Sequence, residues 1–376
     1  MFLYHLIILC LLLIPFGISV MNFIGFARIR RGERPARTLS ASILVPARNE
    51  ERVIERCVRS LLAQDYPDTE VIVLDDGSGD DTGKILEELA RENPRLRVLR
   101  GQPLPPGWVG KNWACHQLAA HAFGDWLMFT DADTVHQPES LTAAVAFAER
   151  ENIGLLSGVP RQKLETFWER DIVPMVAFQY FAHLPNRWIT SKADPKFSAA
   201  NGQMLLFTRD AYRATGGHER VRAELVEDIW LGRAAKQAGI RAALATATGT
   251  VECRMYTSLG EIVRGFSKNL FPALDRSIPG AIVFILLMLL LYAAPLLFTI
   301  AGALRGDFSL AGFQLPLACL LMGMAMRGMM AVRFRLGPAQ IFHHSLSAFM
   351  LAAIAVNSIR WTYSSTGTQW KGRTYS

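Results

Sequence analysis

The sequence predicts an α/β domain with a mostly parallel sheet, placed between transmembrane helices at both ends of the chain. Three observations support this fold class: an apolar run at residues 2–26, alternating strand and helix patterns over 39–276, and three further apolar runs near the C-terminus. Of the 376 residues, 51% are hydrophobic. About 20 apolar residues cross the hydrocarbon core of a bilayer, so the terminal runs are long enough to span it.

The first apolar run is expected to be a retained membrane anchor. It is almost uncharged, and Arg28, Arg30, Arg31 and Arg34 follow it at once. A signal peptide would carry its positive charges before the run and a small-residue cleavage site after it. The reversed order places residues 28–37 on the cytoplasmic side.

The C-terminal runs cover 278–304, 310–332 and 341–359. If all three crossed the membrane, the C-terminus would lie outside, whereas the flanking Arg360, Lys371 and Arg373 favour the inside. Either the run that contains Arg327 or the short last run is therefore expected to be re-entrant or interfacial.

The pattern predicts a multi-pass protein of a bacterial cytoplasmic membrane with a cytoplasmic central domain. The expected parts are an anchor over 1–27, the central domain over 38–253, an amphipathic interfacial segment over 254–276, membrane helices over 277–360 and a tail over 361–376.

Charge and cysteine content narrow the class of protein. The net charge of +7 comes largely from arginines beside the apolar runs, which suits an anionic membrane surface. No basic stripe with interleaved aromatic residues is present, so nucleic acid is not an expected partner. The five cysteines show no C-x-x-C spacing, which fits a reducing cytoplasm and neither a disulfide framework nor a zinc site.

Short apolar strands alternate with helical patterns in the central domain. The expected strands cover 42–45, 70–74, 96–99 and 125–130, and the helices between them cover 51–64, 84–91 and 113–123, with Asn49 as the cap of the first helix. This order implies a parallel sheet, where ligands bind beyond the carboxyl ends of the strands. No G-x-G-x-x-G or Walker A sequence is present, which argues against a dinucleotide dehydrogenase or a P-loop kinase.

Two carboxylates follow the strand over 125–130. Residues i and i+2 of a strand point to the same side, so Asp131 and Asp133 are expected to converge beyond its end. Close carboxylates repel, and a divalent cation such as Mg²⁺ removes the repulsion. An ordinary Asp-rich loop is the alternative for this motif taken alone.

Two further acidic pairs precede and follow this motif. Asp75 and Asp76 end the second strand, where they either form a turn with the following Gly-Ser or accept hydrogen bonds from a nucleoside. Glu227 and Asp228 open a helical segment, where they serve as helix-capping groups or as a catalytic base.

The order of these motifs resembles that of family 2 glycosyltransferases. The matching segments are Pro-Ala-Arg-Asn-Glu at 46–50, Asp-Asp-Gly-Ser at 75–78, Asp-Ala-Asp at 131–133 and Glu-Asp at 227–228. The segments 105–114, 201–203, 254–256 and 265–269 resemble the membrane-bound subgroup associated with carotenoid and hopanoid pathways. The resemblance implies an inverting enzyme with a nucleotide-sugar-binding GT-A fold.

The resemblance also implies roles for individual residues. A nucleotide-sugar site, with a UDP-sugar as the expected donor, would comprise Pro46, Ala47, Arg48, Glu50, Asp75, Asp76, Lys111, Asp131, Asn201 and Gly202. Asp133, with Asp131, would bind Mg²⁺ or Mn²⁺. Asp228 would be the general base, with Glu227 beside it. The Q-x-x-R-W motif of processive synthases is missing, which argues against polymer synthesis.

A lipid is the expected acceptor. Residues 259–274 form an amphipathic pattern before a membrane segment, which predicts either an interfacial helix or one packed on the core. The candidate acceptor-side residues are Arg254, Lys268, Trp188 and His218. Two alternatives to glycolipid synthesis are a polyprenyl-phosphate sugar transferase and a non-catalytic membrane scaffold with a degenerate transferase domain.

Overall fold

The computed structural model describes residues 1–364, 368–370 and 372–375 and contains two compact units. The first, here called the sheet domain, comprises Ala27–Lys163 and Arg187–Met255. The second, here called the helical domain, comprises Met1–Phe26, Leu164–Asn186 and Tyr256–Ser376. Residues 164–186, which the sequence suggested as part of the central domain, therefore group with the apolar helices.

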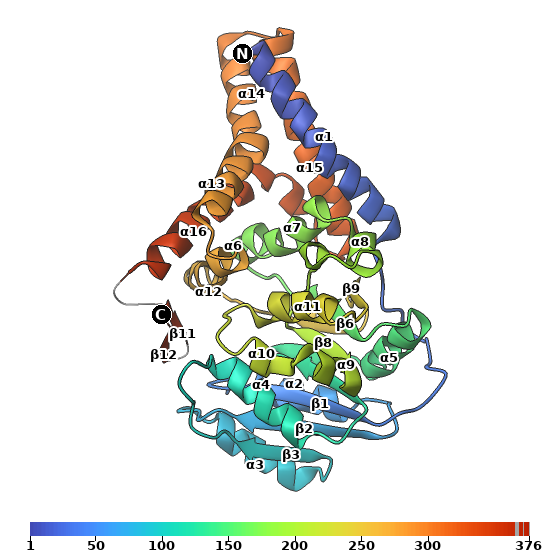
Figure 1. The fold of residues 1–376 in the computed structure, drawn as a ribbon. Helices are drawn as coiled ribbons and strands as arrows, with labels where there is room; N and C mark the ends of the chain where they lie inside the picture. Colours follow the sequence, from blue (N-terminus) through green and yellow to red (C-terminus); the bar gives the residue numbers. More distant parts are fainter. Residues whose placement is uncertain (365–367, 371, 376) are drawn as a thin grey trace. The chain divides into compact units, whose positions relative to one another are not determined.

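A seven-stranded sheet forms the centre of the sheet domain (Figure 1). Its strands are β1 (Ala41–Ala47), β2 (Thr69–Asp75), β3 (Leu96–Arg100), β4 (Trp126–Thr130), β6 (Leu155–Val159), β8 (Met204–Thr208) and β9 (Ala242–Thr246). Their order is β3-β2-β1-β4-β8-β6-β9. β8 runs antiparallel to both of its neighbours, and the other pairs are parallel. The predicted mostly parallel α/β fold is confirmed.

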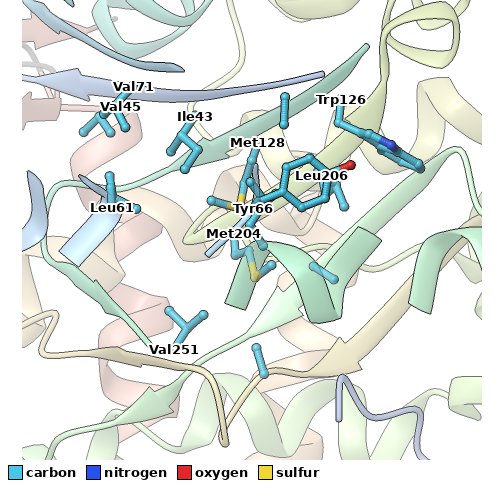
Figure 2. Packing of buried hydrophobic residues seen from close by; sticks show 14 of the residues in the cluster. Ile43, Val45, Leu61, Tyr66, Val71, Trp126, Met128, Met204, Leu206 and Val251 are labelled. Atoms are coloured by element: carbon cyan, nitrogen blue, oxygen red, sulfur yellow. The ribbon is translucent and has the colours of Figure 1, made fainter. Parts of the chain in front are cut away.

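The central strands are mostly apolar, and both of their faces are buried. Ile43 and Val45 of β1 join one hydrophobic cluster, part of which is drawn in Figure 2, while Leu44 between them joins a second cluster. Met128 and Phe129 of β4 divide between the two clusters in the same way. Successive side chains of a strand point to opposite faces, so a continuous apolar run fills both layers.

Helices cover each face. Side chains of α2 (Ile54–Leu62), α3 (Thr82–Glu92) and α5 (Ser140–Arg150) join the first cluster, and those of α4 (Gly110–His121), α9 (Arg209–Thr215) and α11 (Glu227–Gln237) join the second. The remaining elements are α8 (Asn186–Ser191), η1 (Pro195–Phe197), α10 (Gly217–Arg220) and a small sheet of β5 (Thr134–His136), β10 (Val251–Cys253) and β7 (Arg161–Gln162).

The prediction that Asn49 caps the first helix is wrong. That helix, α2, begins only at Ile54 and has Val53 at its N-cap position. Asn49 adopts a positive φ of 53°, and its side-chain oxygen accepts a hydrogen bond of 2.8 Å from the backbone N–H of Gly79. Asparagine tolerates this left-handed conformation better than most residues, so here it shapes a loop instead of starting a helix.

The helical domain contains long apolar helices and shorter connecting ones. The elements are α1 (Phe2–Gly25), α6 (Phe167–Ile172), α7 (Met175–His183), α12 (Leu259–Ala273), α13 (Ile278–Leu287), η2 (Met288–Ala293), α14 (Ala294–Arg305), η3 (Leu310–Gln314), α15 (Leu315–Arg333), η4 (Pro338–Ile341), α16 (His344–Thr362), β11 (Thr368–Trp370) and β12 (Arg373–Tyr375). The η2 and η3 segments are π-helical turns that run directly into helices with a proline near their start. A proline lacks the N–H that a regular helical turn would use, so these wider turns are placed where the pattern is interrupted.

Three helical stretches are long and apolar enough to cross a membrane: Phe2–Gly25, Ile278–Arg305 and Leu310–Arg333. Among the described residues, the helix over the short last run, α16, is not one of them. The run that contains Arg327 is. Its guanidinium is fully buried and donates a hydrogen bond of 2.8 Å to the backbone carbonyl of Asp171 in α6. A charged group within an apolar helix is typically turned inward toward a polar partner, as it is here.

Residues 164–186 are bound to α1 through Asn22. The Asn22 amide donates to the carbonyls of Phe181 and Leu184 at 2.8 and 2.9 Å, and its oxygen accepts from the N–H of Asn186 at 2.8 Å. The side chain is only 2% exposed. One buried amide therefore satisfies three backbone groups where the α7 helix ends.

The predicted amphipathic helix is confirmed as α12, and one side of it packs inside the helical domain. Ile262, Phe266 and Phe271 are buried. The Ser358 hydroxyl of α16 donates to the Ser267 carbonyl at 2.5 Å and accepts from the Phe271 N–H at 2.9 Å. The packing alternative thus accounts for part of the apolar side of α12.

Gly124 offers a test of strand packing in the sheet domain. A Cβ atom at this position would lie 2.4 Å from the backbone N of Ser42 and 2.5 Å from the carbonyl carbon of Ala41, so β1 would have to move. Gly124→Ala should cost about 1–3 kcal/mol of stability, the usual range for overpacking. Gly79→Ala is the matched control, because no atom lies within 4 Å of its Cβ position. Thermal unfolding of the detergent-solubilised protein should show a lower midpoint for Gly124→Ala alone, and equal midpoints would contradict this packing.

Candidate active site

The loops after β1 and β2 form the first part of the site. Arg48 donates through Nη1 to the backbone carbonyls of Asp76 and Gly77, the latter at 3.1 Å. The Glu50 N–H donates to the Thr82 hydroxyl at 2.7 Å. Because β1 and β2 are parallel, their carboxyl ends lie side by side, and these bonds fix the two loops to each other.

In the pair Asp75-Asp76, Asp75 is the residue that stabilises the turn. One of its carboxylate oxygens accepts hydrogen bonds from the N–H and the hydroxyl of Ser78, at 2.9 and 2.6 Å. This oxygen of Asp75 therefore stabilises a turn, which was one of the two roles expected for the residue. The Asp76 side chain follows at the same strand end, in a residue that is 6% exposed.

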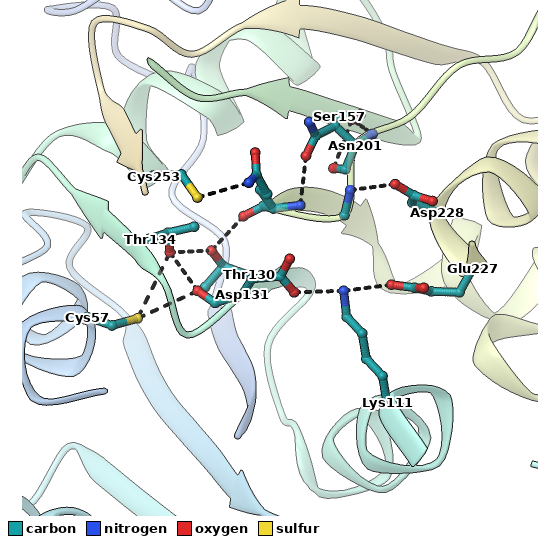
Figure 3. A network of polar contacts seen from close by, with 12 residues as sticks. Cys57, Lys111, Thr130, Asp131, Thr134, Ser157, Asn201, Glu227, Asp228 and Cys253 are labelled. Atoms are coloured by element: carbon teal, nitrogen blue, oxygen red, sulfur yellow. Dashed lines mark hydrogen bonds and ion pairs between the residues drawn. The ribbon is translucent and has the colours of Figure 1, made fainter. Parts of the chain in front are cut away.

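Lys111 forms ion pairs with two carboxylates, those of Asp131 and Glu227 (Figure 3). Its ammonium lies 2.7 Å from Asp131 Oδ1 and 2.7 Å from Glu227 Oε1. Lys111 comes from α4, Asp131 from the loop after β4 and Glu227 from the start of α11. Three segments that are far apart in the sequence thus meet at one nitrogen atom.

The Asp131–Asp133 motif follows β4 as a turn. The strand ends at Thr130, and the Asp131 carbonyl accepts a hydrogen bond of 2.8 Å from the Thr134 hydroxyl. Both carboxylates act on the same neighbour: burial first, and then the charges of Asp133 and Asp131, raise the pKa of the Cys253 thiol well above its usual range. Both carboxylates thus act by charge on the same thiol, and their convergence beyond the strand end stays a prediction.

Within the described residues, no group of three or more His, Cys, Asp and Glu side chains is arranged to hold a metal by itself. Mg²⁺ is usually bound by one or two carboxylates, with substrate phosphates and water supplying the other ligands. Asp131 and Asp133 fit that pattern, and the ammonium of Lys111 at Asp131 shows that the position attracts a positive charge.

Asp228, the expected base, is held in place by backbone hydrogen bonds. Its carboxylate oxygens accept hydrogen bonds of 2.8 Å from the N–H groups of Gly202 and Ile229. Burial, and next the charge of Glu227, raise its pKa to about 6, while Lys111 and the two backbone hydrogen bonds oppose that rise. A base with a pKa near neutrality ionises at physiological pH and still takes up a proton readily. Helix capping alone does not explain Glu227, which faces Lys111.

Asn201 and Gly202 lie beside this carboxylate. The Asn201 N–H donates to the Ser157 hydroxyl of β6 at 2.7 Å, which fixes the loop before β8. A Cβ atom on Gly202 would lie 3.2 Å from Lys111 Nζ and 3.3 Å from Glu227 Oε1. The position therefore has little room for a side chain next to the Lys111 ammonium. Nothing in the sequence pattern pointed to Ser157, because its contribution depends on pairing across the sheet.

The sequence also gave no role to Gln203. Its carbonyl accepts from the Thr130 hydroxyl at 2.8 Å, and its amide donates to Cys253 Sγ at 2.9 Å. The residue is 4% exposed and connects the end of β4 to the small sheet that contains β10. A glutamine carries no motif of its own, although it belongs to the Asn-Gly-Gln segment used for the resemblance.

The candidate acceptor residues fall in both units. His218 is 1% exposed, its Nδ1 lies 2.8 Å from the Tyr212 hydroxyl, and burial lowers its pKa to about 3. The prediction that it touches sugar or acceptor is therefore wrong, because it is enclosed by the core. Trp188 is 38% exposed and contacts Phe197 edge to face. Arg254 belongs to the sheet domain and Lys268 to the helical domain.

A parallel sheet with carboxylates gathered beyond its strand ends is the architecture of a ligand-binding enzyme domain. Residues 42–216 match the model of glycosyl transferase family 2. Over these residues the chain carries a family 2 glycosyltransferase domain, and it resembles carotenoid glycosyltransferases, as the motifs predicted.

Two curated relatives carry the name 4,4'-diaponeurosporenoate glycosyltransferase. The protein of Staphylococcus haemolyticus strain JCSC1435 is 27% identical over 272 residues, which is 70% of this chain and 69% of the relative. The protein of Staphylococcus aureus strain USA300 is 27% identical over 273 residues, which is 69% of this chain and 70% of the relative.

Among solved structures, the mannosyltransferase PcManGT from Pyrobaculum calidifontis, in complex with GDP-Man and Mn²⁺, is similar with a TM-score of 0.58. It is 19% identical, and the match covers 96% of this chain and 100% of that one. At this identity the likeness concerns the fold.

The pKa of Asp228 predicts the pH dependence of transfer. A general base works only when ionised, so kcat/KM should fall about tenfold per pH unit below about pH 6 and level off above about pH 7. Since the Lys111 charge holds this pKa down, Lys111→Met should move the fall to higher pH. Initial rates at constant ionic strength measure both profiles. A wild-type kcat/KM that does not change between about pH 5 and 7 would show that Asp228 is not the general base.

Proposed function

We propose that the protein is a membrane-bound inverting glycosyltransferase that moves a sugar from a nucleotide-sugar donor to a lipid acceptor of the carotenoid, hopanoid or related glycolipid type. The observation that carries this proposal is the Lys111 bridge, which joins Asp131 of the motif expected to bind the donor to Glu227, the neighbour of the expected base Asp228. The names of the relatives, which are carotenoid-associated transferases, support the acceptor class.

The donor would bind beyond the carboxyl ends of β1, β2 and β4. Asp75, Asp76 and the loop from Pro46 to Glu50 would enclose the nucleoside, since hydrogen bonds hold these loops together. Asp131 and Asp133 would hold a divalent cation, which neutralises charge on the leaving diphosphate when it is bound. The Mn²⁺ bound by the similarly folded mannosyltransferase supports a cation in this role.

Transfer would take place in one displacement. Asp228 takes the proton from an acceptor hydroxyl, the acceptor oxygen bonds to the anomeric carbon, and the bond from that carbon to the diphosphate oxygen breaks. The configuration inverts because the acceptor attacks opposite the leaving group. Lys111 lies between the two sides of this reaction and can offer its positive charge to the departing diphosphate.

The apolar helices support a lipid acceptor and give a consistent topology. We place three crossings at Phe2–Gly25, Ile278–Arg305 and Leu310–Arg333, with α16 on the cytoplasmic side. This arrangement puts Arg28–Arg37 and the C-terminal Arg360 inside, and Met1 and the short turn after α14 outside. It removes the conflict in positive charge that four crossings would create.

Replacement of Asp228 tests the reaction. Asp228→Asn keeps the shape of the side chain but cannot take the proton, so kcat should fall by about 10²–10⁴-fold while nucleotide affinity changes little. The matched control is Asp210→Asn, because Asp210 is an exposed carboxylate at the start of α9. Purified protein is supplied with each common nucleotide sugar and lipid extract, and products are measured by mass spectrometry. Full activity of Asp228→Asn would refute the base, and no transfer by the wild type would favour the scaffold alternative.

Labelling of single cysteines tests the topology. In a Cys10→Ser background, Phe308→Cys in the turn after α14 should react with a membrane-impermeant maleimide in intact cells. Ala339→Cys before α16 and Ser364→Cys after it should react only after permeabilisation, because α16 does not cross. Labelling of Ser364→Cys from outside, with Ala339→Cys protected, would show that α16 spans the membrane.

A further inference from the structure

We propose that Lys111 occupies the cation position of the donor site until the nucleotide sugar arrives, so that the divalent cation and the lysine ammonium compete for Asp131. This inference rests on the proposed function, because it assumes that the cation binds at Asp131 and Asp133. It goes further by giving Lys111 a role in the nucleotide-free protein.

The geometry places the ammonium between two acids from different parts of the site. Lys111 Nζ is 2.7 Å from one oxygen of Asp131 and 2.7 Å from one oxygen of Glu227. The Glu227 side chain is 8% exposed, whereas those of Lys111 and Asp131 are 35% and 28% exposed. The lysine is therefore held from the buried side by Glu227 and meets Asp131 at the more open side, where a donor would enter.

The charges explain why a cation and Lys111 exclude each other. The Lys111 ammonium is a positive charge paired with two carboxylates, those of Asp131 and Glu227. A divalent cation on Asp131 would place like charges within a few ångströms of each other, and like charges at such distances are strongly unfavourable. Cation binding must therefore displace the ammonium from Asp131.

The surroundings limit where the displaced ammonium can go. Gly202 lies close behind it, since a Cβ atom there would be 3.2 Å from Nζ, and its N–H is already bonded to Asp228. Glu227 remains a partner for Lys111, and the diphosphate of a donor offers new anionic oxygens. The lysine would thus exchange one anion for another only when both cation and diphosphate are present, which favours binding of the two together.

Binding of Mn²⁺ alone to the nucleotide-free, full-length protein in detergent tests this competition. Lys111→Met should bind Mn²⁺ at least about tenfold more tightly than the wild type, the scale on which a neighbouring opposite charge alters a carboxylate. Lys111→Arg keeps the charge and should leave the affinity near the wild-type value. Lys84→Met removes an exposed lysine of α3 and is the control for net charge. Affinities come from calorimetry or from the electron paramagnetic resonance signal of free Mn²⁺.

A double variant covers the chance that Lys111→Met leaves Glu227 too poorly compensated to fold. Lys111→Met with Glu227→Gln removes one charge of each sign and still releases Asp131, so its Mn²⁺ affinity should also rise. Equal affinities in the wild type and both Lys111→Met variants would overturn the proposal.

The donor separates this proposal from the proposed function. With uridine diphosphate present, the gain from Lys111→Met should shrink, because the wild-type lysine then has the diphosphate as a partner. Asp133→Ala should weaken Mn²⁺ binding in both the wild-type and the Lys111→Met backgrounds. Absence of Mn²⁺ binding to every variant, with and without uridine diphosphate, would refute the cation site and the competition together. Binding that requires Asp133 but ignores Lys111 would refute the competition alone.

Discussion

The parallel pairing of β1 with β2 and β4 is the constraint on which the site depends. Both faces of these strands are buried along most of their length, so their central side chains pack in the core. Only the residues after the last pairs, such as those that follow Asp75 and Thr130, leave the core together at one edge. The acidic motifs are 56 residues apart along the chain, counted from Asp75 to Asp131, and yet this register brings them to the same edge of the sheet.

Much of this fold was predictable, because continuous apolar strands and amphipathic helices have strong local patterns. The first four strands fell within a residue or two of their observed bounds, whereas α2 began later than predicted. The error came from Asn49, whose side-chain oxygen accepts a hydrogen bond from the Gly79 N–H of another loop and not from the first turn of α2. A capping residue and a loop-bridging residue look alike until the partner loop is placed.

The site was predictable in its residue types and less so in their contacts. Asp228 and Lys111 could be named from motif order, but no local pattern indicates that one ammonium binds Asp131 and Glu227 at once. His218 shows the opposite case, since a polar side chain after two glycines looked accessible and is packed against Phe129. Contacts between distant segments decide both outcomes, and the sequence of one chain does not encode them in any short window.

The insertion of residues 164–186 has a consequence for how the chain is made. Asn22 emerges from the ribosome early, but the carbonyls it binds at Phe181 and Leu184 follow about 160 residues later, and the helices after Tyr256 come last. Until then the buried Phe178 and Phe181 lack part of their packing, a state in which exposed apolar surface promotes aggregation. A chain ended after Met255 would stay in that state permanently. The sheet domain is thus interrupted along the chain by a segment whose packing partners are made both before and after it.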